Sequence, residues 1–197
     1  RRDAGIKGLS LFFIDRVDIY APAEGIIRRQ FVQAFNEIKA THADWKHLEA
    51  ERVQASYFAQ KRRSGGETET LDSVSGKTKE DEAAYDLIMK DKERLLSFEE
   101  PVAFIFSHSA LREGWDNPNV FQICTLNQTT SEVKKRQEVG RGMRLSVNQA
   151  GDRIKDERIN VLTVVANESY ERYVERLQSE IEEEYGKEGL PPKPPDA

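Results

Sequence analysis

Two arginines and a glutamine in the second half of the sequence have the spacing of a phosphate-binding helix face. Gln137, Arg141 and Arg144 stand at positions i, i+4 and i+7, so one helix would project all three from the same side. Each guanidinium offers a planar fork of N–H donors that matches phosphate oxygens, a fork that lysine lacks. These residue types favour a polyphosphate site, although a solvated basic helix face has the same spacing.

Two glycines lie among these side chains. A glycine in a helix interior costs about 1 kcal/mol relative to alanine, which argues against an ordinary solvated helix. Gly140 and Gly142 therefore indicate either close backbone approach or an early helix end. Ser131 is predicted to cap the start of the helix.

A second group of residues precedes this helix. Gly114, Asp116 and Pro118 follow a predicted buried strand, so they occupy a loop at the carboxyl end of that strand. Taken alone, these three turn-forming residues would predict only a turn. The complete segment 111–120 carries more information than its turn residues.

Both segments resemble superfamily 2 helicases. The pattern Gln-x-x-Gly-Arg-x-x-Arg at 137–144 resembles motif VI of these enzymes, and segment 111–120 resembles motif V. One departure is that the second glycine stands at 142, one place earlier than in the general pattern. Met143 occupies the usual glycine position, which affects the local helix end and leaves the spacing of the two arginines unchanged.

Longer stretches are similar to one family in particular, the restriction (Res) subunit of type III restriction-modification enzymes. These stretches are 104–126, 136–145 and 148–149, together with 9–16, which resembles the opening strand of that family's second motor lobe. The resemblance touches most of the chain and is thin between residues 40 and 76.

This resemblance implies catalytic roles for the residues of the motif VI pattern. ATP hydrolysis spreads negative charge over the γ-phosphoryl oxygens, and an inserted arginine can be worth about 10³-fold or more in rate. Arg141 and Arg144 are the arginines that the resemblance assigns to this charge. Gln137 would lie near the γ-phosphate or the attacking water.

The resemblance also implies binding residues. Gly114 is assigned to the nucleotide's phosphates and Asp116 to its ribose, and Gly140 is a further nucleotide-binding residue. His108 and Ser109 occupy the stretch that touches a nucleic-acid phosphate in related helicases, a contact that a hydroxyl can make. A histidine such as His108 is more often structural than a ligand.

Several parts of an ATPase are missing from the sequence. Gly76-Lys77-Thr78 is not a phosphate loop, because Leu71 stands where that loop needs a glycine and no apolar strand leads in. There is no Asp-Glu pair for magnesium, and one cysteine with three scattered histidines predicts no metal site. The chain resembles half of an ATPase, in which ATP and Mg²⁺ would bind against a preceding RecA-like lobe. The chain alone is predicted to be inactive.

Apolar runs alternate with helical patterns along the chain, which predicts an α/β fold: a RecA-like parallel sheet with helices on both faces. Strands are predicted at 9–14, 55–59, 102–106, 119–126 and 159–165, and helices at 24–39, 79–98, 131–144 and 168–185. We predict one helicase lobe over 1–185, with an irregular insertion or hairpin at 41–78. Residues 186–197 are predicted to be a Pro-rich linker or tail.

Composition sets the broad class. Charged residues make up 33% of the chain, and no apolar run approaches the roughly 20 residues of a membrane span. The single cysteine excludes an internal disulfide and fits the cytoplasm. The net charge of −5 is unusual for a DNA partner, but residues 168–197 hold nine acidic and four basic residues, so the acidity lies in the tail.

The sequence therefore favours the second motor lobe of a type III Res subunit. Its expected partners are DNA, the first RecA-like lobe of the same protein and the methylase (Mod) subunit, with no membrane. One alternative is the same lobe of another superfamily 2 DNA helicase. The other is a non-catalytic nucleotide- or nucleic-acid-binding module, in which the arginines only clamp an anion.

Overall fold

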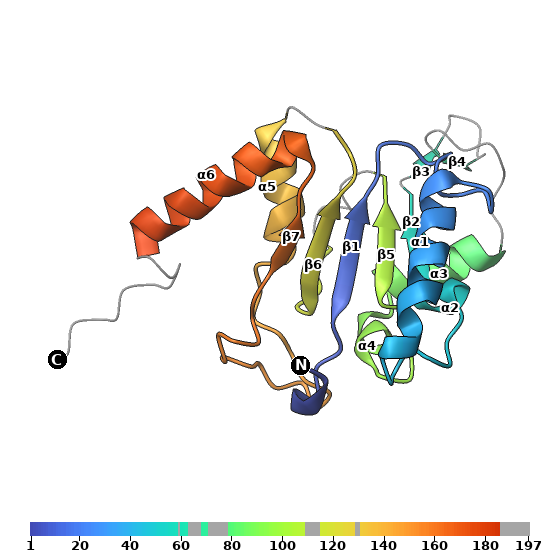
Figure 1. The fold of residues 1–197 in the computed structure, drawn as a ribbon, viewed down its shortest axis with the longest axis horizontal. Helices are drawn as coiled ribbons and strands as arrows, with labels where there is room; N and C mark the ends of the chain where they lie inside the picture. Colours follow the sequence, from blue (N-terminus) through green and yellow to red (C-terminus); the bar gives the residue numbers. More distant parts are fainter. Residues whose placement is uncertain (59, 63–67, 71–78, 109–114, 129–130, 186–197) are drawn as a thin grey trace.

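A parallel sheet of five strands forms the centre of the computed structural model (Figure 1). The model describes residues 1–58, 60–62, 68–70, 79–108, 115–128 and 131–185. The strands are β1 (Leu9–Phe13), β2 (Gln54–Tyr57), β5 (Phe104–Ser107), β6 (Val120–Thr125) and β7 (Thr163–Val165). They lie in the order β2-β5-β1-β6-β7, and every neighbouring pair is parallel.

The two faces of the central strand are buried against different helices. Side chains alternate along a strand, so Leu11 and Phe13 point to one face and Phe12 to the other. Leu11 and Phe13 belong to the core under α3 (Lys79–Met89) and α4 (Lys92–Leu96). Phe12 stacks on Phe106, with 4.7 Å between the ring centroids, in the core under α1 (Ile26–Ile38). Burial on both faces explains the continuous apolar runs.

The predicted fold class is confirmed, because a five-stranded parallel sheet with helices on both faces is a RecA-like α/β arrangement. The strands expected at 9–14 and 119–126 are β1 and β6, and the helix expected at 24–39 is α1. A short helix, α2 (Ala50–Val53), leads into β2.

Three sequence predictions need correction. The prediction of a single helix at 79–98 is wrong, because α3 and α4 are separate helices. Asp91 lies between them and caps the start of α4, where its side chain accepts a hydrogen bond from Arg94 N at 3.3 Å. The strand expected at 159–165 is only the three-residue β7. β2 belongs to the main sheet as an edge strand, although its surroundings were predicted to be irregular.

The remaining elements lie outside the sheet. β3 (Gln60–Arg62) and β4 (Thr68–Thr70) form an antiparallel pair. Two short 3-10 turns cover Arg2–Ala4 and Lys39–Thr41. The helix α5 (Glu132–Gly140) carries the start of the motif VI segment, and α6 (Glu168–Tyr185) packs beside it before extending away from the sheet (Figure 1). Residues 76–78 and 186–197 lie outside the described residues.

Candidate functional site at the motif V and motif VI segments

The motif VI segment is only partly helical. Ser131 accepts from Lys134 N at 3.3 Å, so the predicted cap is confirmed. The helix ends at Gly140, Arg141 is the capping residue, and Arg144 lies beyond the helix. The prediction that one helix face carries Gln137, Arg141 and Arg144 is therefore wrong; the early helix end is the alternative that holds.

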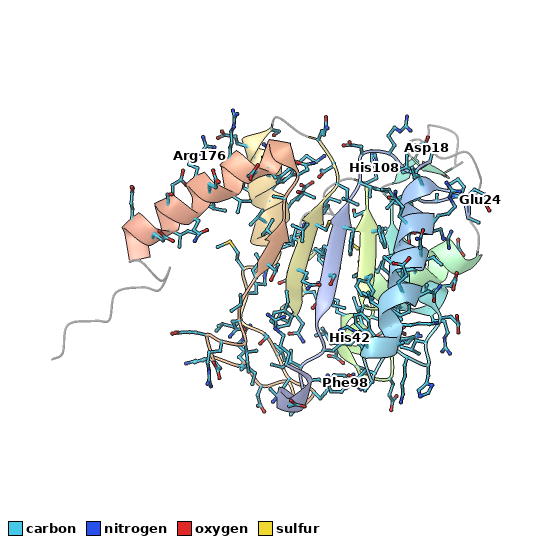
Figure 2. The ribbon with its side chains drawn as sticks, viewed as in Figure 1. Asp18, Glu24, His42, Phe98, His108 and Arg176 are labelled. Atoms are coloured by element: carbon cyan, nitrogen blue, oxygen red, sulfur yellow. The ribbon has the colours of Figure 1, made fainter. Side chains whose placement is uncertain are left out.

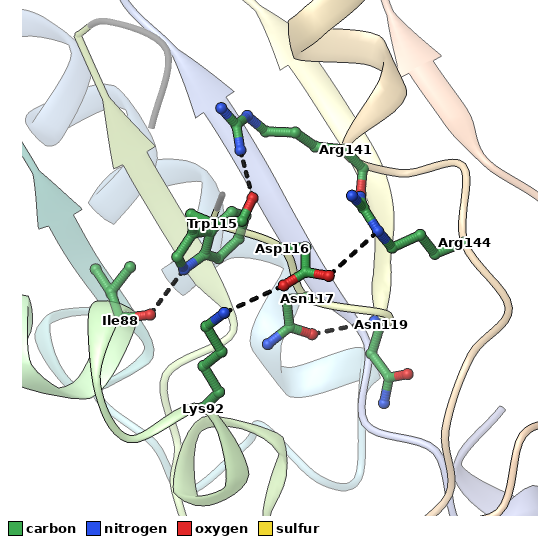
Figure 3. A network of polar contacts seen from close by, with 8 residues as sticks. All are labelled: Ile88, Lys92, Trp115, Asp116, Asn117, Asn119, Arg141 and Arg144. Atoms are coloured by element: carbon green, nitrogen blue, oxygen red, sulfur yellow. Dashed lines mark hydrogen bonds and ion pairs between the residues drawn. The ribbon is translucent and has the colours of Figure 1, made fainter. Parts of the chain in front are cut away.

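Arg141 points into the protein. It is 8% exposed, and its Nη1 donates to the Trp115 carbonyl at 2.6 Å (Figure 3). Burial lowers the pKa of this guanidinium, the nearby Arg144 charge lowers it further, and Glu138 opposes both. An arginine stays charged at neutral pH even so. The contact fastens the motif VI segment to the motif V loop.

Arg144 is held much more loosely. Its side chain is 39% exposed, and its Nε lies 3.6 Å from Oδ2 of Asp116. Its Nη1 makes two long contacts of 3.4 Å, to the carbonyls of Gly140 and Arg141. Contacts of this length between exposed groups contribute little, at most about 1 kcal/mol. Arg144 can therefore leave this position at low cost.

Asp116 lies between cations from two parts of the chain. Lys92 Nζ is 3.2 Å from Oδ1, and Arg144 approaches Oδ2 (Figure 3). The hydrogen bond from Lys92 is the main cause that lowers the pKa of this carboxyl, followed by the charges of Lys92 and Arg144. Asp116 is thus ionised at neutral pH and is able to accept hydrogen bonds.

The rest of the motif V loop is fastened from several sides. Trp115 is 3% exposed and its Nε1 donates to the Ile88 carbonyl at 2.8 Å. Asn117 accepts from Asn119 N at 3.0 Å. The side chain of Asn119 exchanges two 2.8 Å bonds with the backbone of Val147. The two asparagine side chains thus bind backbone groups of the protein. Asp116, between Trp115 and Asn117 in the sequence, is a charged side chain of this loop.

The two glycines differ in their surroundings. A Cβ at Gly142 would lie 2.3 Å from Leu162 Cδ1, so close packing inside the chain accounts for that glycine. A Cβ at Gly140 would meet nothing within 4 Å. No contact with the described residues therefore requires a glycine at 140.

A buried carboxylate that the sequence analysis missed lies next to Gln137. Glu138 is 0% exposed and accepts hydrogen bonds from Tyr170 of α6 and from Asn127 Nδ2, the latter at 3.2 Å. Burial raises the pKa of Glu138, and these two donors work in the opposite direction. Outside this contact, Arg176 of α6 pairs with Glu132 of α5 at 2.5 Å. The motif VI helix is therefore tied to α6.

Other predicted residues lie elsewhere or cannot be placed. Gln137 is exposed on α5. His108 is part-buried directly after β5, at the carboxyl edge of the sheet (Figure 2), whereas Asn119 pairs with β1 at the amino edge. His108 and Asn119 thus lie at opposite edges of the sheet. Ser109 and Gly114 lie outside the described residues.

Two features of the described residues bear on metals and membranes. No group of three or more histidine, cysteine or acidic side chains in the described ranges could hold a metal ion. Within the same ranges, no helix combines the length and apolar character needed to cross a membrane.

Comparison with curated proteins identifies relatives of one kind. The chain is 37% identical over 181 residues to the type III restriction-modification enzyme StyLTI Res subunit of Salmonella typhimurium, 38% over 160 residues to the EcoPI Res subunit of Escherichia phage P1, and 39% over 166 residues to the EcoP15I Res subunit of Escherichia coli. Each match covers 77% of this chain. The chain is a homologue of one segment of the type III Res subunits.

The predicted resemblance to type III Res subunits is thereby confirmed. The chain spans only 16–17% of the length of these relatives, so it corresponds to a small part of a Res subunit. No family model matches the chain.

Proposed function

We propose that this chain is the second motor lobe of an ATP-dependent DNA translocase, the Res subunit of a type III restriction-modification system. The observation that carries the proposal is that two arginines, held to different degrees, lie near the ionised Asp116. Arg144 is 39% exposed and loosely held, and Arg141 is buried. Similarity to the three Res subunits over 77% of the chain supports it.

The two arginines would have different tasks at the ATP. Arg144 gives up only weak contacts when it moves, so it is suited to follow the charge that appears on the γ-phosphoryl group. Arg141 is fixed by its 2.6 Å hydrogen bond to the Trp115 carbonyl and would hold the motif V loop and the motif VI segment in position relative to each other. A guanidinium has five N–H donors, and we propose that Arg141 also contacts a phosphate.

The other groups of the site would complete the nucleotide contacts. Asp116 would accept hydrogen bonds from the ribose, and Gln137 would orient the attacking water. Gly140 faces open space and would admit a phosphate, while Gly114 would supply a backbone N–H in the same region. ATP brings Mg²⁺ with it; the first RecA-like lobe would contribute the phosphate-loop lysine and the carboxylates that hold the metal.

DNA would bind away from these groups. His108 lies at the carboxyl edge of the sheet, and with Ser109 it would contact the sugar-phosphate backbone, which carries no base sequence. In the complete enzyme we propose a methylase (Mod) subunit as partner, DNA cleavage by a separate nuclease domain, and a location in the cytoplasm.

A magnesium-dependent ATPase assay tests the proposal that this chain holds only half of the ATP site. The 197-residue chain alone should show negligible turnover and bind ATP with a Kd of about 1 mM or weaker, which is only about 4 kcal/mol, because half of the phosphate contacts lie on the first lobe. The complete enzyme is the positive control. Robust turnover by the chain alone would contradict the proposal, and Arg144 variants without any ATPase defect would favour a non-catalytic anion clamp.

A further inference from the structure

A cation that lies outside the helicase-like motifs contacts the motif V carboxylate. Lys92 is the first residue of α4, and its Nζ lies 3.2 Å from Oδ1 of Asp116. Arg144 approaches the other oxygen, Oδ2, at 3.6 Å. The two oxygens of one carboxylate are therefore held by different cations, from segments on either side of motif V (Figure 3).

The corner between α3 and α4 also supports the neighbouring residue. Trp115 donates to the carbonyl of Ile88, near the end of α3, and belongs to the same core cluster as Leu95 of α4. Asp91 caps α4 and so fixes where that helix begins, which sets the position of Lys92. Two successive motif V residues are thus positioned by one corner of the fold.

We infer that Lys92 is a positioning residue for the nucleotide's ribose, because it holds the Asp116 carboxylate in place while Arg144 is exchanged for phosphate. The inference rests on the proposed function, in which Asp116 faces the ribose. A carboxylate has about four acceptor sites on its two oxygens. When Arg144 leaves Oδ2, that oxygen can accept from a ribose hydroxyl while Oδ1 keeps its bond to Lys92.

A purely structural surface ion pair is the competing explanation. The Lys92 and Asp116 side chains are 38% and 52% exposed, and pairs of this kind add little to stability. The chain offers a matched control two residues away. Lys90 Nζ lies 2.7 Å from Asp86 Oδ1, also on the surface, and both residues lie outside the two motifs in the sequence. If the pair near Asp116 were only structural, removing either lysine should have the same effect.

The test compares nucleotides that differ in one ribose hydroxyl. Lys92→Met and Lys90→Met are introduced into the complete enzyme, and steady-state hydrolysis of ATP, 2′-deoxy-ATP and 3′-deoxy-ATP is measured. Lys92→Met should raise KM for ATP about two- to five-fold, the scale of an exposed ion pair, with a smaller change in kcat. KM for the analogue that lacks the contacting hydroxyl should stay the same. Lys90→Met should change none of these values.

An Asp116→Ala background shows whether Lys92 acts through the carboxylate. Asp116→Ala should abolish the preference for ATP over that analogue, and adding Lys92→Met should then change KM no further. Two results for Lys92→Met would overturn the inference and leave the proposed function intact. One is an equal rise of KM for all three nucleotides, and the other is a preference for ATP over the deoxy analogues equal to that of the native enzyme. If Asp116→Ala itself keeps the full preference, the ribose role of Asp116 in the proposed function fails as well.

Discussion

Four residues of segment 140–144 form two pairs that differ in how closely the rest of the chain holds them. The inward pair, Arg141 and Gly142, packs against the protein: the guanidinium binds the Trp115 carbonyl at 2.6 Å, and the glycine lies against Leu162. The outward pair, Gly140 and Arg144, has an open Cβ position and a side chain held by contacts of 3.4 Å or longer. The fold explains the inward pair, whereas the outward pair has residue types that the contacts of the described chain do not require.

This difference indicates how one motif can serve two purposes. The inward pair keeps the motif V and motif VI segments together in the isolated chain. The outward pair is available to something outside it, which we propose to be ATP on the first motor lobe. Substitutions in the two pairs should therefore separate stability from catalysis.

The largest change in stability is expected for Gly142→Ala. The new Cβ would lie 2.3 Å from Leu162 Cδ1, and overpacking of this kind costs about 1–3 kcal/mol. Denaturant unfolding of the chain measures the loss. In a Leu162→Ala background Gly142→Ala should cost less, because the smaller side chain leaves room for the methyl group. A Gly142→Ala chain as stable as the native one would show that this glycine is not needed for packing.

Gly140→Ala should act in the opposite direction. Alanine is better than glycine in a helix by up to about 1 kcal/mol, and nothing lies within 4 Å of the added methyl group. The chain should therefore become slightly more stable in the same unfolding assay. In the complete enzyme the ATPase rate should fall, because the methyl group would occupy space that a phosphate or the first lobe needs. An unchanged rate would remove Gly140 from the proposed site.

A smaller, pH-dependent effect is expected from Glu138. Burial raises its pKa in the folded chain above the ordinary value of 4.5, so the folded chain binds the proton more tightly than the unfolded chain. Its contribution to stability is present below pH 4.5 and is lost as pH rises through the folded pKa. Glu138→Gln cannot titrate, so its stability relative to the native chain should increase from pH 4 towards pH 7. A difference that does not vary with pH would contradict the raised pKa.

Much of the fold could be predicted because burial on both faces leaves a simple pattern. The mostly apolar sequences of β1 and β6 are typical of strands buried on both faces, and α1 has a clear apolar stripe. The edge strand β2 was harder, since its four residues lie in a polar stretch. The break between α3 and α4 depends on Asp91 capping the second helix, and the same residue type also occurs within helices.

The candidate site was predicted less completely. Helical spacing places Arg141 and Arg144 on one helix face, but the helix ends at Gly140. The two guanidiniums contact successive residues of the motif V loop, Trp115 and Asp116, and differ in burial. Lys92 lies 24 residues before Asp116, and no local pattern reports a contact of that kind. Glu138 looks like any charged helix residue in the sequence; only its burial against Tyr170 distinguishes it.

The most direct test of the central claim is the ATPase activity of Arg144→Ala in the complete enzyme, with Arg144→Lys and Arg141→Ala as companions. If Arg144 meets charge that develops only in the transition state, Arg144→Ala should lower kcat by about 10³-fold and change KM for ATP far less. Arg144→Lys should recover little, because lysine lacks the planar fork. Arg141→Ala should lower stability as well as kcat.

DNA binding without ATP, measured on the same Arg144→Ala enzyme, completes the test. DNA binding should survive, because Arg144 would face the nucleotide and His108, a proposed DNA contact, lies at the carboxyl edge of the sheet. Normal ATP hydrolysis together with lost DNA binding would contradict the proposed role of Arg144, since Arg144 would then face nucleic acid.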